Sequence, residues 1–275
     1  MAIVDNSMLG KDSTYVDRYA PELLFPIARS ESRASLGISH QALPFVGEDV
    51  WTSYEVSWLN LGGKPQVAIA RFQVPCSSPN IIESKSFKLY LNSFNQERLE
   101  SEAALSALLE KDLSAAAGAT VGVTLERLNT VARGLSEPEG VCVDDIDACD
   151  FSYEQNPKLL QLDSDQEVEE TLYSELLRSN CPVTNQPDWG SVVIRYRGPK
   201  INHESLLRYI VSFRQCQDFH EHCAEQIFCD LMSQCDCRSL SVLARYTRRG
   251  GLDINPYRAT PDLSETSPGT RFVRQ

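Results

Sequence analysis

Alternating apolar and polar residues predict a β-hairpin in the first half of the chain. In "WTSYEVSWLN" (51–60), Tyr54, Val56 and Trp58 fall on one face, and the alternation then ends at a turn former. After the turn "LGGK", the run "QVAIARFQV" (66–74) is typical of a returning strand. Two such runs joined by a short glycine-containing turn are the pattern of a hairpin.

Helix-forming residues follow this hairpin. The stretches "ESKSFKLYLNSF" (83–94) and "ERLESEAALSALLEKDLSAAA" (97–117) predict two helices, and "TVGVTLERL" (120–128) predicts another strand. Residues 134–165 are acidic and rich in turn formers, which favours a connection between two halves of the chain.

The second half repeats the order of the first. "SVVIRYRG" (191–198) predicts a strand, "ESLLRYIVSFRQ" (204–215) and "HEHCAEQIFCDLMSQC" (220–235) predict helices, and "SLSVLARYTRR" (239–249) predicts a further strand. The run "EVEETLYSELL" (167–177) fits either a helix or a strand, because its helix formers also alternate.

The two halves match in detail as well as in order. "VAIARF" precedes "ESKSFKLYLNSF" by a short loop, and "VVIRYR" precedes "ESLLRYIVSF" in the same way. This favours a tandem duplication of a unit in the order strand–strand–helix–helix–strand–strand. We therefore expect an α+β fold of antiparallel sheets with helices layered on one face. We divide the chain into a lead-in segment (1–45), a first unit (46–145) and a second unit (146–275).

Composition narrows the possible functions. The chain has 275 residues, a net charge of -12 and a pI of about 4.9. A protein that grips a nucleic-acid backbone needs concentrated Lys and Arg, so this acidic balance disfavours direct nucleic-acid binding. No apolar run approaches the ~18 residues that span a membrane, and the first residues lack the pattern of a signal peptide. Nine cysteines without an export signal indicate reduced thiols and a cytoplasmic protein.

The loop "SNCPVTNQPDW" holds a cysteine and an aspartate seven residues apart, Cys181 and Asp188. Pro182 pushes Cys181 towards extended geometry, so we expect it at the end of a strand. Taken singly, Cys181 is typical of a small buried apolar residue, and Asp188 of a side chain that bonds a turn amide. Together they offer a nucleophile and a proton source on one short loop.

The helix predicted over 220–235 opens with His220 and Glu221. At helical spacing His220 falls on the inward stripe formed by Ala224, Ile227 and Leu231, whereas His222 points away. A structural interpretation is available, because Asp218 followed three residues later by Glu221 resembles a capping box. An inward His and Glu at a helix start could equally face a ligand, beside the positive end of the helix.

No metal site and no nucleotide motif is predicted from spacing. Cys223, Cys229, Cys235 and Cys237 lie near two histidines, but they form neither paired C-x₂-C units nor an H-E-x-x-H motif. The chain also lacks a G-x-G-x-x-G sequence and a P-loop.

The stretch Glu83 to Tyr90, "ESKSFKLY", resembles the signature of the NADPH-dependent nitrile reductases of queuosine biosynthesis, the 7-cyano-7-deazaguanine reductases. "SNCPVTNQPDW" and "FHEHCAEQIF" match further motifs of that family, and the resemblance is to its long, two-module form. It implies two tandem tunnelling-fold (T-fold) units, with the signature in the first unit and the nucleophile in the second.

The resemblance implies a covalent mechanism. Attack by the Cys181 thiolate on the nitrile carbon gives a thioimide, which splits one difficult reduction into easier steps. Asp188 is the implied proton donor to the nitrogen, a role that requires a raised pKa near neutral pH. We expect Trp189 to supply part of the apolar enclosure that raises it. Two hydrides, one from each of two NADPH molecules, then give the primary amine.

The resemblance also assigns the binding residues. Substrate contacts fall on the start of the signature and on the helix start, and they are Ile82, Glu83, Ser84, His220 and Glu221. His220 is also expected to assist proton delivery. The residues expected to bind NADPH are Ser84, Lys85, Arg249 and Gly250, since cations suit a phosphorylated dinucleotide and glycine allows close approach of the backbone.

The expected substrate is the free 7-deazapurine base rather than tRNA, and the expected assembly is a homodimer, with no metal and no membrane partner. Two other functions stay open on the sequence alone. One is a zinc-dependent T-fold enzyme of the GTP cyclohydrolase type. The other is a non-catalytic module that binds a pterin or purine.

Overall fold

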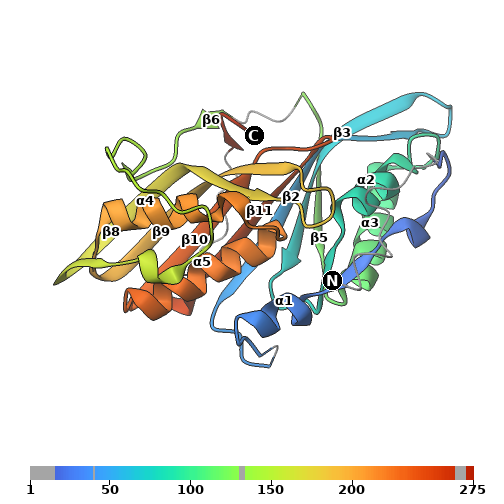
Figure 1. The fold of residues 1–275 in the computed structure, drawn as a ribbon. Helices are drawn as coiled ribbons and strands as arrows, with labels where there is room; N and C mark the ends of the chain where they lie inside the picture. Colours follow the sequence, from blue (N-terminus) through green and yellow to red (C-terminus); the bar gives the residue numbers. More distant parts are fainter. Residues whose placement is uncertain (1–15, 40, 130–133, 264–270) are drawn as a thin grey trace.

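One large β-sheet runs through the molecule, and helices pack against it (Figure 1). The computed structural model describes residues 16–39, 41–129, 134–263 and 271–275. In order across the sheet, its eight strands are β5 (Gly122–Glu126), β3 (Pro65–Pro75), β2 (Val46–Leu59), β11 (Leu252–Ala259), β10 (Ser239–Tyr246), β9 (Pro187–Ile201), β8 (Leu162–Asn180) and β7 (Val141–Cys142). Neighbouring strands are antiparallel except for β7 and β8, which are parallel.

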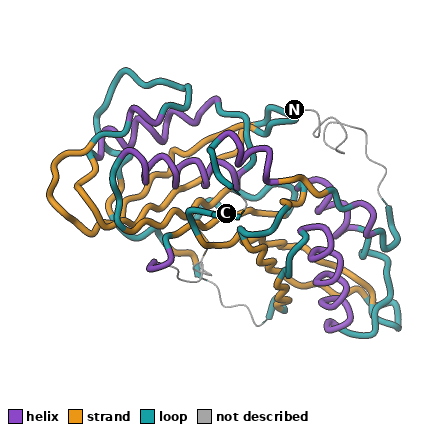
Figure 2. Tube along the Cα trace, turned by 90° about the horizontal axis from the view of Figure 1, so that it is seen from below, coloured by secondary structure: helices purple, strands orange, loops and turns teal. Residues whose placement is uncertain are grey.

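Two pairs of helices lie along the sheet (Figure 1, Figure 2). Helices α2 (Ser84–Asn92) and α3 (Glu102–Ala117) follow the β2–β3 hairpin, and α4 (His203–Ser212) and α5 (His220–Gln234) follow the β8–β9 hairpin. The first pair packs on β2 and β5, and the second pair packs on β8, β10 and β11.

Both helix pairs cover the same face of the sheet. Ile254 of β11 lies opposite Trp51 of β2, and both pack with Phe87 of α2. Arg258, four residues further along β11, bonds Glu225 of α5. Residues an even number apart on a strand share a face, so α2 and α5 lie on one side of the sheet.

The same succession of elements occurs twice. A hairpin, two helices and a strand that pairs with the second strand of the hairpin appear as β2–β3–α2–α3–β5 and again as β8–β9–α4–α5–β10. Strand β11 pairs with β2 as well as with β10, and so joins the two halves into one sheet. The predicted class, α+β with a mostly antiparallel sheet, is confirmed.

The start of one helix differs from the sequence prediction, and the ambiguous run is resolved. Helix α3 begins at Glu102 rather than at residue 97, because the side chain of Ser101 accepts the amide of Ala104 and caps the helix there. The ambiguous run 167–177 is strand, because it lies within β8 and pairs with β9 along its length.

Two strands of the large sheet were not predicted, the short β7 at its edge and the central β11. Strand β10 ends at Tyr246, three residues before the predicted end at Arg249, and a turn leads into β11. The sequence of β11, "LDINPYRA", alternates between apolar and polar residues only over its first four positions, and its Pro256 argues against a central strand. All eight residues are nevertheless buried, because β11 lies between two strands and under α5.

Short elements complete the fold. Helix α1 (Arg29–Ser35) lies in the predicted lead-in segment, of which residues 1–15 fall outside the described part. Two-stranded sheets are formed by β1 (Pro26–Ala28) with β4 (Asn80–Ile82) and by β6 (Leu135–Ser136) with β12 (Arg271–Phe272). Single turns of 3-10 helix occur at Pro21–Leu23, Pro157–Leu159, Phe213–Gln215 and Pro261–Leu263. No helix in the described residues has the length and apolar character needed to cross a membrane.

Candidate functional site

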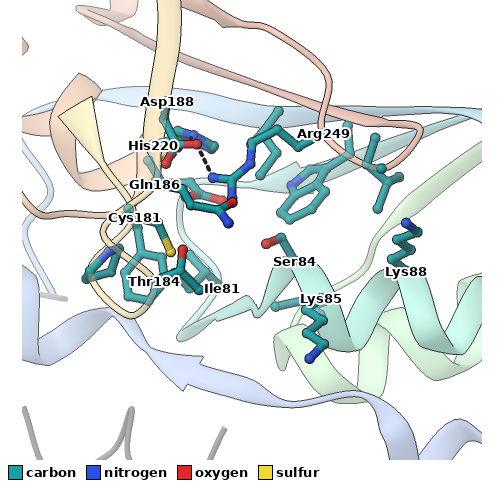
Figure 3. A pocket seen from close by; sticks show the side chains of 18 of the residues that line it. Ile81, Ser84, Lys85, Lys88, Cys181, Thr184, Gln186, Asp188, His220 and Arg249 are labelled. Atoms are coloured by element: carbon teal, nitrogen blue, oxygen red, sulfur yellow. Dashed lines mark hydrogen bonds and ion pairs between the residues drawn. The ribbon is translucent and has the colours of Figure 1, made fainter. Parts of the chain in front are cut away.

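A cavity of about 350 Å³ opens where α2, the β8–β9 turn, the start of α5 and the β10–β11 turn meet. Figure 3 shows the side chains of Cys181, Thr184, Gln186 and Asp188 on one side of it and those of Ser84, Lys85 and Lys88 on the other. Its walls are formed by Trp51, Ile81, Ile82, Ser84, Lys85, Lys88, Cys181, Pro182, Thr184, Gln186, Asp188, Asp218, Phe219, His220, Glu221, Thr247, Arg249, Gly250, Leu252 and Ile254. All but one of the sequence-predicted site residues are in this set.

Cys181 follows directly on strand β8, at the strand end that the sequence predicts. Its amide donates to the carbonyl of Gln186 at 2.9 Å, and its carbonyl accepts from the amide of Asn185 at 3.0 Å. These bonds close a tight turn, and Asn185 adopts the positive φ of 53° that such a turn requires. Cys181 is only 8% exposed, and its sulfur points into the cavity in Figure 3.

Asp188 lies on strand β9 and not in the loop, which corrects the sequence prediction. It pairs with Ser179 of β8, so its direction is fixed by the strand. Because side chains alternate along a strand, Trp189 points to the opposite face. It is 39% exposed there and stacks with Arg178 and Arg214. Trp189 therefore provides no enclosure for Asp188.

The pKa of Asp188 is lowered, contrary to the expectation for a proton donor. Burial acts to raise it, but the hydrogen bond and charge of His220 and the charge of Arg249 outweigh burial. Arg249 forms an ion pair with Asp188, marked by a dashed line in Figure 3, and its second nitrogen donates to Gln186 at 2.6 Å. Asp188 is thus held as a carboxylate at neutral pH.

His220 lies between Asp188 and an aromatic ring. Its Nε2 is 3.4 Å from a carboxylate oxygen of Asp188, and its ring lies 3.9 Å from that of Tyr246, measured between centroids. Tyr246 is fully buried on β10 and supports the imidazole from behind. This arrangement fixes the direction in which His220 faces the cavity.

The predicted capping box does not form. The N-cap of α5 is Phe219, and no side chain caps it. Asp218 instead accepts the amide of Phe219 and binds Nδ1 of His222, which is buried rather than pointing into solvent. Glu221 is consequently free of a capping role and faces the cavity.

Glu221 has the opposite electrostatic character to Asp188. It is 3% exposed, and burial raises its pKa to about 7; the nearby carboxylate of Asp49 adds to the rise, whereas His220 and Arg29 oppose it. A carboxyl group that titrates near neutral pH can change its charge when a ligand binds.

Glu83 is the one predicted contact that does not line the cavity. Its carboxylate accepts the amides of Lys85 and Ser86, both at 2.7 Å, and so caps the first turn of α2. Ile82 and Ser84, on either side of it, do reach the cavity. The geometry therefore gives Glu83 a supporting role in holding the signature helix.

Arg249 and Gly250 lie on the β10–β11 turn opposite α2. Gly250 has a φ of 60°, and a Cβ built on it would fall 2.5 Å from Nζ of Lys88. The missing side chain thus makes room for the Lys88 ammonium beside Arg249. With Lys85 also on the wall, this region of the cavity suits the phosphates of a dinucleotide such as NADPH.

Sequence reasoning missed several wall residues, chiefly Lys88, Trp51, Gln186 and Thr184. Helical spacing could have found Lys88, since it follows Ser84 by one turn on the same helix face. Nothing in the local sequence marks Trp51, because its place depends on how β2 packs in the sheet. Within the described ranges, no group of three or more His, Cys, Asp or Glu residues is arranged to hold a metal ion.

Two family models match the chain. One, described as "Nitrile reductase, 7-cyano-7-deazaguanine-reductase N-term", matches residues 15–125, and the other, described as "QueF-like protein", matches residues 187–265. Together they include each segment that forms the cavity except the turn that carries Cys181.

Curated proteins named NADPH-dependent 7-cyano-7-deazaguanine reductase are similar to nearly the whole chain. The protein from Azoarcus sp. (strain BH72) is 56% identical over 270 residues, which are 98% of this chain and 95% of the relative. The protein from Dechloromonas aromatica (strain RCB) is 55% identical over 98% of this chain and 95% of its own. That from Chromobacterium violaceum is 52% identical over 100% of this chain and 98% of its own.

Among solved structures, the apo form of an archaeosine synthase QueF-Like is similar to part of the chain. The match has 18% identity and a TM-score of 0.30, and it covers 34% of this chain and 92% of the other.

Proposed function

Because the chain belongs to the NADPH-dependent 7-cyano-7-deazaguanine reductases, we propose that the cavity at Cys181 is its active site. The enzyme reduces the nitrile of 7-cyano-7-deazaguanine to the primary amine of 7-aminomethyl-7-deazaguanine in queuosine biosynthesis, with NADPH as the reductant. This reaction is placed in the cavity because the predicted site residues, although far apart in the sequence, meet there. Four distant segments, 82–85, 181–188, 220–221 and 249–250, bring their side chains to one enclosed space.

Cys181 is the nucleophile in this proposal. A carbon–sulfur bond forms between its thiolate and the nitrile carbon, and the nitrogen takes a proton, which leaves a covalent thioimide. NADPH, when bound, would supply one hydride per molecule, so two NADPH in succession are needed to carry this group to the amine. Between the two reductions the carbon–sulfur bond breaks, so the Cys181 thiolate is restored and the enzyme is unchanged.

Asp188 is the proton donor, and it must first gain a proton. In this structure its negative charge is held by Arg249 and His220. Arg249 is also assigned to the cofactor, so one guanidinium serves two anions in turn. When Arg249 turns towards a phosphate, Asp188 keeps only His220, and burial then raises its pKa towards that of a useful acid.

Glu221 recognises the base. An ionised carboxylate accepts two parallel N–H groups, and the guanine-like edge of a 7-deazapurine offers a ring N–H beside an exocyclic amine. Ile82 and Ser84 form the opposite wall, and Glu83 holds them by capping α2. His220 steers the nitrile towards Cys181 and Asp188.

We further propose that residues 46–145 and 146–275 are tandem T-fold units behind the lead-in segment 1–45. The repeated succession of a hairpin, two helices and a strand supports this assignment. We also propose a cytoplasmic homodimer that acts on the free base, in agreement with the resemblance and with the net charge of -12. Sedimentation of the purified protein would test the dimer.

Intact-protein mass spectrometry tests the active site directly. Incubated with 7-cyano-7-deazaguanine and no NADPH, the wild-type protein should gain the mass of one base, because addition of a thiolate to a nitrile has no leaving group. Cys181→Ala should gain nothing. Cys229→Ala, which removes a half-buried thiol of α5 outside the cavity, is the matched control and should form the adduct. An adduct on Cys181→Ala would overturn the assignment of the nucleophile.

A further inference from the structure

Five buried charged side chains form an ion cluster behind the cavity. Arg29 and Arg33 come from α1, Asp49 from β2, Glu225 from α5 and Arg258 from β11, and each is at most 3% exposed. Arg29 bonds Asp49 at 2.5 Å, Arg33 holds Glu225 through two nitrogens at 2.7 and 3.0 Å, and Arg258 binds both carboxylates at 2.8 Å. We call these five residues the ion cluster.

The ion cluster reaches the cavity through two elements. On α5, Glu225 follows Glu221 by one helical turn, so the two side chains lie on the same face. On β2, Asp49 and Trp51 share a face of the sheet, and Trp51 forms part of the cavity wall. Glu221 is therefore the point at which the cluster meets the substrate site, and it interacts electrostatically with Asp49 and Arg29.

The charges of the cluster do not balance by themselves. Three guanidinium groups face two carboxylates, and the pKa values of Asp49 and Glu225 are held low, although burial acts to raise them, by Arg258 and its neighbouring arginines. One positive charge is left over in a space shielded from water, where electrostatic interactions are strong. An ionised Glu221 would neutralise it.

We infer that the ion cluster, through Arg29 and Asp49, sets the charge that Glu221 presents to the base. This inference rests on the proposed function, in which Glu221 binds the guanine-like edge as a carboxylate. It also gives the lead-in segment a role in the reaction: α1 supplies the guanidinium that favours the ionised form. Arg29 and Asp49 act through Glu221 and are positioning residues.

The charged groups that face Glu221 predict opposite effects for the two positioning residues. Arg29 from α1 and His220 from α5 favour its ionised form, whereas Asp49 from β2 disfavours it. Glu225, one helical turn from Glu221 on α5, is itself paired with Arg258 of β11. Removal of the Asp49 charge should make Glu221 a stronger acid, and removal of the Arg29 charge should make it a weaker one. A purely structural role would impair binding in both variants without this difference in sign.

The test is calorimetric titration of 7-cyano-7-deazaguanine as a function of pH, in a Cys181→Ala background so that no covalent bond forms. In that background the affinity should fall as the pH drops through about 7, the pKa of Glu221, by up to about tenfold per pH unit. Asp49→Asn should move this decline to lower pH, and Arg29→Gln should move it to higher pH. The direction in which either variant shifts the pH of this decline tests the inference, so one variant suffices if the other does not fold.

Two further variants serve as controls. Arg29→Lys keeps the positive charge and should restore the pH dependence of the background. Arg33→Gln removes a guanidinium that is equally buried and binds the same Glu225, so it should lower the melting temperature but shift the pH dependence less than Arg29→Gln.

Shifts of Asp49→Asn and Arg29→Gln in the same direction, or no shift in a variant that binds the base, would overturn the inference. A background protein that binds no base at any pH would instead overturn the proposed function and the inference with it. The two failures are thus distinguishable.

Discussion

Asp188 and Glu221 are two carboxyl groups of one cavity with opposite electrostatic character. Both are buried, at 4% and 3% exposure, so loss of water raises both pKa values. For Asp188 the hydrogen bond and charge of His220 and the charge of Arg249 reverse this effect. For Glu221 the charge of Asp49 adds to burial, and its pKa reaches about 7. Two titratable groups with divergent environments are the usual sign of two distinct roles.

The charged neighbours of Asp188 and Glu221 also differ in how far they are exposed to solvent. The Arg249 side chain is 38% exposed on a turn at the mouth of the cavity, so it has room to turn away from Asp188. Arg29 and Asp49, the partners of Glu221, are enclosed in the ion cluster at 3% exposure or less. The difference teaches that the pKa of Asp188 can change when Arg249 moves, whereas the pKa of Glu221 is set by buried groups that the fold holds in place.

The largest effect should come from Asp188→Asn, which removes the proton donor and keeps its shape. NADPH oxidation should fall about 10²–10⁴-fold, the usual contribution of general acid catalysis, with base affinity nearly unchanged. Steady-state NADPH absorbance and calorimetry measure the two quantities. Asp230→Asn is the control, since Asp230 is buried on the same α5 that carries His220 but binds Tyr209 away from the cavity. Normal turnover in Asp188→Asn would remove Asp188 from the mechanism.

Glu221→Gln should weaken base binding and flatten its pH dependence. A hydrogen bond to a charged group contributes about 1.5–3 kcal/mol, so affinity should fall about 10–150-fold above neutral pH. Glutamine cannot titrate, and the decline in affinity near the Glu221 pKa of about 7 should therefore vanish. Calorimetry over that pH range measures both effects, and a decline that persists would assign it to another group.

Arg249→Gln should test the contrast by raising the pKa of Asp188 towards the raised pKa of Glu221. Without the guanidinium the pKa of Asp188 in the free enzyme rises, so the protonated acid survives to higher pH and the alkaline limb of kcat/KM moves upward. The KM for NADPH should rise about tenfold, as expected when one charged contact is lost. The pH profiles of kcat and KM separate the two effects. Arg248→Gln is the control, because Arg248 stacks on Tyr54 outside the cavity wall.

Much of the fold could be predicted, because alternation and helical spacing are local properties. The β2–β3 hairpin, the four long helices and the repeated order follow from runs that bury one face each. Strand β11 could not be predicted, since it is buried on both sides and carries polar residues whose partners lie far away in sequence. Asp253 binds Tyr54, and Arg258 binds Glu225.

The candidate site, like the fold, could be predicted only where local sequence determines it. Its residues could be proposed from short motifs, but their charge states could not, because the deciding partners are remote. Asp188 owes its lowered pKa partly to Arg249, and Glu221 is influenced by Arg29 and Asp49. No local pattern places α1 against α5, although the ion pair of Arg33 with Glu225 joins them.

The smallest effect is expected from the β10–β11 turn, which carries Arg249, the exposed partner of Asp188. Gly250→Ala places a Cβ 2.5 Å from Nζ of Lys88 at a φ of 60°, whereas Gly251→Ala, at a φ of 87°, meets nothing within 4 Å. Both should lose about 1 kcal/mol of stability from backbone strain, measured by thermal unfolding. Only Gly250→Ala displaces Lys88, so only it should raise the KM for NADPH, by a few-fold with kcat unchanged. Equal KM values in the two variants would show that Lys88 takes no part in cofactor binding.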